Sequence, residues 1–276
     1  MILSSEEIVF GKNEIFMAER GWEKDIHDSI KLIKFFYKSD GHTVEAYSAF
    51  PAENFEMLPV ILWNRGGDNK SGLLEYFTAY SILGEIASWG YNVMASQYRR
   101  EDEFGGRDIY DVINLFYLAK NLGFENDSFG LEGWSRGGMM CYRILSEIKN
   151  VRCAVIVAGL ADLISNEKIN KQLHRIFKNY FNTEDKSELL RNLKERSAVF
   201  FYEKIAPDTP ILFIHGTDDN KVLIDDTVEM FNRLRHFNKN TEYSFEVING
   251  GDHFLKKYKK EVSGLKKKWF AKYLKI

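Results

Sequence analysis

The chain has 276 residues, of which 45% are hydrophobic, and a formal net charge of -2. These values suit one large α/β domain with a substantial core, and we expect residues 1–276 to form a single domain. The near-neutral charge argues against a general attraction to nucleic acid or to anionic membranes.

The first residues do not have the basic and then apolar character of a leader, and no apolar run approaches about 18 residues. We therefore expect a cytoplasmic protein that has no membrane partner and no nucleic-acid partner. Cys141 and Cys153 lie among apolar neighbours, which predicts two buried free thiols.

The N-terminal third predicts an arm followed by antiparallel strands. Residues 1–30 have the spacing of an amphipathic helical arm. Strand-like runs at 31–37 and 44–50 flank Ser39-Asp40-Gly41, which is a hairpin signal.

From there strands and helices alternate. Strands are expected at 58–63, 91–96, before residue 133, and at 153–158, 211–214 and 243–248; helices are expected at 73–89, 108–122 with Asp108 as its cap, 139–148, 225–237 and the C-terminus. Such alternation predicts right-handed crossovers and a mainly parallel sheet. Functional sites in these sheets lie at the carboxyl ends of the strands.

Two further segments bear on function. Residues 160–207 are too long for an ordinary connection and contain helical stretches at 168–180 and 188–195, so we expect a cap over the strand ends. Its aromatic residues suit either an acyl pocket or core packing: Phe177, Tyr180, Phe181, Phe200, Phe201 and Tyr202. The lysines at 256–260 and 266–268 are expected on the solvated face of the terminal helix.

The most informative segment is Gly133-Trp134-Ser135-Arg136-Gly137, which lies between a strand-like and a helix-like run. A serine at a sharp strand-to-helix turn takes an unfavourable backbone conformation, and the flanking glycines give room where the chain doubles back. The following helix directs its unpaired amides at an oxyanion, with the amide of Arg136 as the first donor. The pattern predicts Ser135 as a nucleophile, and its chance occurrence is the alternative.

Two turns downstream offer the acid and the base that a serine nucleophile needs. The strand at 211–214 leads into His215-Gly216-Thr217-Asp218-Asp219, and the last strand leads into Gly250-Gly251-Asp252-His253. Both turns follow strands, so they are expected at the sheet edge that carries Ser135. The order serine, acid, histidine is that of the α/β-hydrolases, with Asp162, Asp218 and Asp219 open as the acid.

Together these motifs resemble the catalytic domain of the prolyl oligopeptidase family of serine peptidases. The resemblance runs from about residue 36 to the end of the chain and rests on several motifs in order: Ser39-Asp40-Gly41, Gly66-Gly67, Tyr98-Arg99-Arg100, Gly133-Trp134-Ser135-Arg136-Gly137-Gly138, His215 to Val222, and Gly251-Asp252-His253. It implies an α/β-hydrolase fold, that is, a mainly parallel twisted sheet with helices on both faces and a helical cap insertion. It also implies a mechanism without a cofactor or a metal ion.

The family pattern His-Gly-x-x-Asp-x-x-Val implies Asp219 as the catalytic acid, because Val222 follows three residues later. Asp218 is the competitor and Asp162 a more distant one. The resemblance implies His253 as the base and gives His215 a structural place at the strand end. The remaining histidines match no motif and are expected at the surface: His27, His42, His174 and His236.

Where the family has His-Gly-Gly-Pro, this chain has Arg65-Gly66-Gly67-Asp68. The resemblance implies that the amide of Gly67, with Gly66 as the alternative, is the second oxyanion donor beside that of Arg136. Losing one such donor typically costs about 10²–10³-fold in rate.

The arginines beside this predicted oxyanion site have two interpretations. A guanidinium of Arg65 or Arg136 can hold a substrate carboxylate, and Trp134 is a further candidate for substrate binding. The interpretation that we favour is internal pairing of both arginines with carboxylates, for which Asp68, Glu101 and Asp102 are candidates.

The sequence thus predicts a serine hydrolase that cleaves an ester or a peptide bond through an acyl-enzyme, with a small-molecule ester or a short peptide as substrate. The larger members of the family carry a β-propeller that restricts access to small peptides, whereas only about 30 residues precede the predicted hydrolase fold here. Peptidase and carboxylesterase activities both stay open. A non-catalytic binding module on the same fold is the alternative. The oligomeric state is open, and a homo-oligomer is compatible with the sequence.

Overall fold

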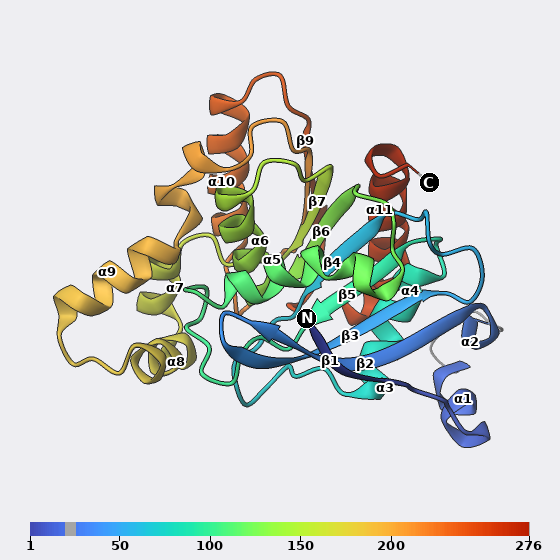
Figure 1. The fold of residues 1–276 in the computed structure, drawn as a ribbon. Helices are drawn as coiled ribbons and strands as arrows, with labels where there is room; N and C mark the ends of the chain where they lie inside the picture. Colours follow the sequence, from blue (N-terminus) through green and yellow to red (C-terminus); the bar gives the residue numbers. More distant parts are fainter. Residues whose placement is uncertain (20–25, 276) are drawn as a thin grey trace.

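A nine-stranded sheet organises the computed structural model, which describes residues 1–19 and 26–275 (Figure 1). Its strand order is β1-β2-β3-β5-β4-β6-β7-β8-β9. The strands are β1 (Ile2–Glu7), β2 (Ile30–Ser39), β3 (His42–Pro51), β4 (Val60–Asn64), β5 (Asn92–Ser96), β6 (Phe129–Trp134), β7 (Cys153–Val157), β8 (Ile211–Gly216) and β9 (Tyr243–Ile248). The first three pairs in this order, β1/β2, β2/β3 and β3/β5, are antiparallel. The remaining pairs, from β5/β4 to β8/β9, are parallel.

Helices cover both faces of this sheet (Figure 1). One face packs against α5 (Ile109–Tyr117), α6 (Arg136–Glu147) and α10 (Ile224–Phe237). The other packs against α3 (Tyr76–Ala79), α4 (Glu85–Ala87) and α11 (Lys259–Tyr273). The central strands β4 to β8 are buried on both faces, which explains the largely apolar runs of β4, β7 and β8. The predicted α/β-hydrolase architecture is confirmed.

The described insertion between β7 and β8 has three α-helices, and two short 3-10 helices after them, rather than the two stretches predicted. The α-helices are α7 (Leu163–Ile169), α8 (Lys171–Phe181) and α9 (Lys186–Arg196), which project beyond one end of the sheet (Figure 1). Asn170 ends α7 and caps α8 by accepting the amides of Gln172 and Leu173, so the predicted stretch 168–180 is divided between two helices. We call residues 160–207 the cap segment.

The prediction of a helical arm is wrong for the first residues. Ile2–Glu7 form β1, which pairs with β2 at the edge of the sheet. Five of its six side chains are exposed, so β1 has no alternation of apolar and polar residues to mark it as a strand. Helices α1 (Lys12–Glu19) and α2 (Ile26–Ser29) follow, whereas residues 20–25 and the side chain of His27 lie outside the part described.

The prediction of a solvated lysine face is wrong at Lys266. This side chain is buried, and its ammonium group donates to Glu132 Oε1 of β6 at 2.7 Å. Glu132 is 1% exposed. The pair ties α11 to the strand that precedes Ser135, and a lysine-rich run does not show which of its members faces inward.

We expect Lys266→Met to lower the free energy of unfolding by about 3–5 kcal/mol, because it leaves the buried Glu132 carboxylate without its cation. Urea unfolding followed by tryptophan fluorescence measures the change. The matched control is Lys267→Met at the exposed neighbour, which should stay within about 0.5 kcal/mol of the wild type. Equal losses in the two variants would contradict this role of the ion pair.

Candidate active site

Ser135 occupies a sharp turn between β6 and α6. Its backbone angles are φ 58° and ψ -119°, a conformation that costs a non-glycine residue about 1–3 kcal/mol. A Cβ on Gly133 would lie 2.1 Å from the carbonyl oxygen of Gly137, and one on Gly137 would lie 1.9 Å from that of Asn64. The predicted strand-turn-helix and its need for two glycines are therefore confirmed. The surrounding packing holds the serine in its strained position.

His253 and Asp219 lie in direct contact. The Nδ1 of His253 is 2.7 Å from Asp219 Oδ2, and the other carboxylate oxygen accepts the amides of Lys221 and Val222 at 2.8 and 3.0 Å. With Nδ1 bonded to a carboxylate, the imidazole keeps Nε2 to accept a proton. This geometry is the one that a histidine base and its orienting acid require.

A second imidazole contacts the same carboxylate. His215, fully buried at the end of β8, has its Nε2 3.2 Å from Asp219 Oδ2 and its Nδ1 2.7 Å from the hydroxyl of Thr227. Burial alone would raise the pKa of the Asp219 carboxyl, but the hydrogen bonds from His215 and His253 outweigh it and hold that pKa well below its usual range. The predicted place of His215 at the strand end is confirmed, and its contact with Asp219 was not foreseen.

The two competing carboxylates are engaged elsewhere. Asp218 is exposed and accepts the hydroxyl of its neighbour Thr217. Asp162 caps α7 by accepting the amides of Ile164 and Ser165. Of the three candidates that the sequence left open, Asp219 is the one that the fold brings to His253.

The loops that carry these residues are fastened to one another at the carboxyl ends of the parallel strands. The indole nitrogen of Trp134 donates to the carbonyl oxygen of His253 at 2.9 Å. The backbone amide of Asp218 donates to the carbonyl oxygen of Gly251, also at 2.9 Å. The ends of β6, β8 and β9 are thus linked. The indole N–H, which is the only polar group of the Trp134 side chain, is used in this link. A contact of the Trp134 ring with substrate stays a prediction.

The loop of residues 66–72 lies against the turn at Ser135. A Cβ on Gly66 would be 3.4 Å from Ser135 Cβ. The carbonyl of Gly66 accepts from Arg65 at 3.1 Å, so the amide of Gly67, in the same trans peptide, points away from that guanidinium. Within the described residues neither the Gly66 nor the Gly67 amide has a hydrogen-bond acceptor. Gly67 and its alternative Gly66 therefore each have an amide that is unpaired in the part of the chain described, and the assignment of the second oxyanion donor stays a prediction.

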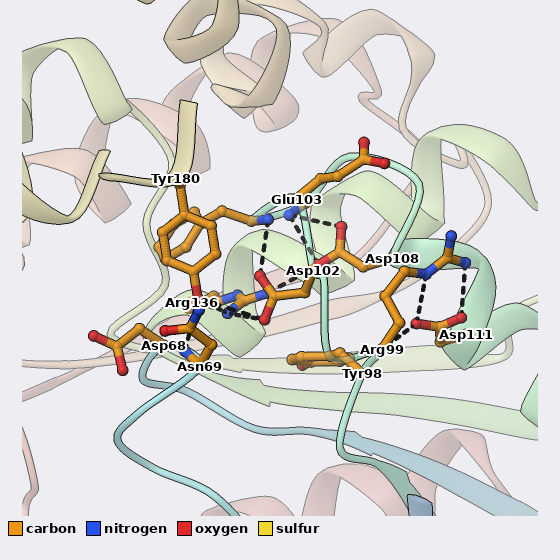
Figure 2. A network of polar contacts seen from close by, with 12 residues as sticks. Asp68, Asn69, Tyr98, Arg99, Asp102, Glu103, Asp108, Asp111, Arg136 and Tyr180 are labelled. Carbon is orange, nitrogen blue, oxygen red and sulfur yellow. Dashed lines mark hydrogen bonds and ion pairs between the residues drawn. The ribbon is translucent and has the colours of Figure 1, made fainter. Parts of the chain in front are cut away.

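Two buried arginines, Arg65 and Arg136, flank the predicted oxyanion site. Figure 2 shows Arg136 with its carboxylate partners Asp102 and Asp108. The Arg136 guanidinium lies 2.9 Å from Asp102 Oδ1 and 2.8 Å from Asp108 Oδ2, and the ring of Tyr98 packs against it. Arg65 donates to the backbone carbonyls of Gln97, Gly66 and Asp68, and its guanidinium is 4.0 Å from Asp102. Internal pairing is thus what the structure has, and it leaves neither guanidinium exposed to hold a substrate carboxylate.

In this charged cluster, sequence reasoning named Asp102 as a candidate partner, and Asp102 does pair with Arg136, but it missed Asp108. Asp108 was expected to cap α5, but its side chain makes no capping bond and instead accepts from Arg136 and from the amide of Gly105. Tyr180 of α8 also reaches the cluster, with its hydroxyl 3.3 Å from Arg136. Arg136 itself is the sequence signal for such acidic partners. A charged residue that directly follows the nucleophile lies at a buried turn, and a buried charge requires partners of opposite charge.

Comparisons with known proteins identify the family of the chain. The model of the prolyl oligopeptidase family matches residues 90–276. The chain belongs to this family. It is accordingly a serine hydrolase, and the resemblance seen in the sequence is confirmed. The peptidase YtmA of Bacillus subtilis, itself described as uncharacterized, is 25% identical over 221 residues, which make up 77% of this chain and 83% of YtmA.

Solved structures show the same fold. The acylaminoacyl peptidase of Pyrococcus horikoshii superposes with a TM-score of 0.74 and 19% identity over 90% of this chain and 42% of the peptidase. The esterase Pf2001 of Pyrococcus furiosus superposes with a TM-score of 0.65 and 16% identity over 92% of this chain and 96% of the esterase. This member of the prolyl oligopeptidase family thus spans less than half the length of the acylaminoacyl peptidase.

The described residues contain no group of three or more histidine, cysteine and acidic side chains placed to hold a metal ion. None of the helices in residues 1–19 and 26–275 is long and apolar enough to cross a membrane. The two cysteines are buried and free, as expected, and burial raises the pKa of both thiols.

Proposed function

We propose that this member of the prolyl oligopeptidase family hydrolyses an acyl ester or a peptide bond through a triad of Ser135, His253 and Asp219. The Ser135 hydroxyl attacks the carbonyl carbon while His253 Nε2 takes its proton, and the imidazolium is stabilised by Asp219. The tetrahedral oxyanion accepts from the amides of Arg136 and Gly67.

The intermediate then collapses. Its bond to the leaving group breaks, and His253 returns the proton to that alcohol or amine. The acyl-enzyme on Ser135 is attacked by a water molecule whose proton passes to His253, and a second oxyanion forms in the same place. Its collapse releases the acid and restores the Ser135 hydroxyl.

The observation that carries this proposal is the 2.7 Å contact between His253 and Asp219. It lies at the sheet edge where Ser135 is held in a strained turn, and the serine, acid and histidine follow in the order of the α/β-hydrolases. This arrangement favours catalysis over a non-catalytic binding module, because ligand binding alone does not require a carboxylate that is held toward a histidine by two backbone amides and a second imidazole.

Two series of substrates decide whether the enzyme cleaves an ester bond or a peptide bond. Initial rates are measured for p-nitrophenyl esters of increasing acyl length and for aminoacyl and dipeptidyl p-nitroanilides, each with wild type and Ser135→Ala. Ester turnover alone, dependent on Ser135, assigns a carboxylesterase, whereas anilide turnover assigns a peptidase. Absence of Ser135-dependent turnover together with absence of fluorophosphonate labelling in the folded protein would reject the proposal and favour the binding module.

A further inference from the structure

One side chain of the cap segment reaches the loop of residues 66–72. Tyr180, on the last turn of α8, accepts the backbone amide of Asn69 at 2.7 Å (Figure 2). The same hydroxyl accepts from Arg136 at 3.3 Å and donates to Asp102 Oδ2 at 3.4 Å. Asn69 belongs to the loop of residues 66–72, Arg136 to the start of α6, and Asp102 to the connection between β5 and α5.

The hydroxyl uses all of its hydrogen-bonding capacity on these partners. A tyrosine hydroxyl has one donor and two acceptor sites, and here two donors and one acceptor occupy them. Burial raises the pKa of Tyr180 to about 12, so the proton that it donates to Asp102 is present at neutral pH. Its ring packs edge-on against Phe104 with centroids 5.0 Å apart. Both the ring and the hydroxyl are therefore fixed in place.

The partners of this hydroxyl adjoin both proposed oxyanion donors. Asn69 follows Gly67 by two residues, and Arg136 supplies the first oxyanion amide from its own backbone. The loop has a second fastening of its own, because Asp68 Oδ1 accepts the amides of Lys70 and Ser71. The loop that carries the Gly67 amide is thus held by Arg65, by Asp68 and, from the cap segment, by Tyr180.

We propose that Tyr180 is a positioning residue for the oxyanion site, so that the chain is fully active only when α8 is seated on the loop of residues 66–72. This inference rests on the proposed function. When α8 lifts, the amide of Asn69 loses its acceptor, the Arg136–Asp102 pair is opened to water and the loop that carries Gly67 is freed. The cap segment then acts on the rate of the chemical step as well as on access to the site.

The test is Tyr180→Phe, which keeps the ring against Phe104 and removes the hydroxyl. Oxyanion stabilisation exists only in the transition states, so we expect kcat to fall about 10-fold with KM changed less than about twofold. This loss is smaller than the 10²–10³-fold typical of removing a donor, because the Gly67 amide is displaced rather than deleted. Rates are expressed per active site titrated with a fluorophosphonate, which removes any contribution of unfolded protein.

A matched control and a double-mutant cycle sharpen the result. Tyr243→Phe removes a tyrosine hydroxyl at the start of β9, which accepts from the side chain of Asn238 at 3.1 Å, and should leave kcat unchanged. Asp68→Ala releases another fastening of the loop of residues 66–72. We expect Tyr180→Phe and Asp68→Ala together to lower kcat by clearly less or clearly more than the product of their separate effects, since neighbours acting on one loop are coupled.

The possible outcomes separate this inference from the proposed function. Unchanged kcat per titrated site in Tyr180→Phe, with or without a lower melting temperature, would overturn the inference and leave Tyr180 a structural anchor of the cap segment. So would strictly multiplicative effects in the cycle. A wild type without Ser135-dependent turnover would instead reject the proposed function, whatever the Tyr180 variants do.

Discussion

Ser135→Ala should lower kcat about 10⁶-fold on whichever ester or anilide the wild type turns over best. Removing the nucleophile of a serine hydrolase leaves only binding and oxyanion stabilisation, which still exceed the reaction in water by about 10³–10⁴-fold. Alanine retains the Cβ and suits the same backbone angles about as well as serine, so the variant should fold with unchanged stability. Steady-state assays and fluorophosphonate labelling, read by intact mass, measure the loss.

Two comparisons identify the loss as catalytic. His253→Ala should be about as inactive, and the double variant no worse than either single one, because the nucleophile and its base act as a unit. Ser146→Ala alters a serine near the other end of α6, whose hydroxyl bonds to a backbone carbonyl, and should behave as the wild type. Appreciable turnover by Ser135→Ala would place the nucleophile elsewhere.

Asp219→Asn should lower kcat about 10³–10⁴-fold while leaving the shape of the site in place. An amide cannot stabilise the imidazolium and favours the tautomer in which Nδ1 of His253 lacks its proton, so Nε2 becomes a donor rather than a base. Asp218→Asn is the matched control, because its exposed neighbouring carboxylate should be dispensable. If Asp218→Asn were the more damaging change, the assignment of the acid would be reversed.

The same carboxyl makes the stability of the protein dependent on pH. The pKa of Asp219 in the folded chain lies well below its unfolded value of about 3.9, so the group contributes stability above that value and loses it as the pH falls. We expect the free energy of unfolding of the wild type to fall more steeply than that of Asp219→Asn from about pH 5 downwards. Urea unfolding at several pH values measures the two slopes, and parallel slopes would contradict a lowered pKa.

The elements around Ser135 could be predicted because short-range physics determines them. A turn with the backbone angles of Ser135 needs room on both sides, so the two glycines are visible in the sequence, and they lie between the strand-like run of β6 and the helical spacing of α6. The resemblance to the family pattern, in which a valine follows the acid by three residues, implied Asp219, and the Asp219 carboxylate accepts the amide of Val222. The motif thus reports a real hydrogen bond.

The parts that were mispredicted depend on long-range partners. Asp108 looks like a helix cap until Arg136, 28 positions away, is seen to bind it. Lys266 looks like one lysine of a solvated run until Glu132 is placed beneath it. Strand β1 exists because β2 offers a free edge, which no feature of residues 2–7 announces. In each case the sequence shows the group but not what it meets.

The buried pairing of Arg136 with Asp102 and Asp108 restricts how this enzyme can change over generations. An apolar residue in place of Arg136 would strand two carboxylates in the interior, and neutralising one carboxylate would leave the cation short of a partner. Single steps at any of the three positions should therefore be selected against even where the final combination would be harmless. Laboratory evolution aimed at new substrates should vary positions 102, 108 and 136 jointly, because a variant changed at only one of these positions has a lower folding stability than the wild type.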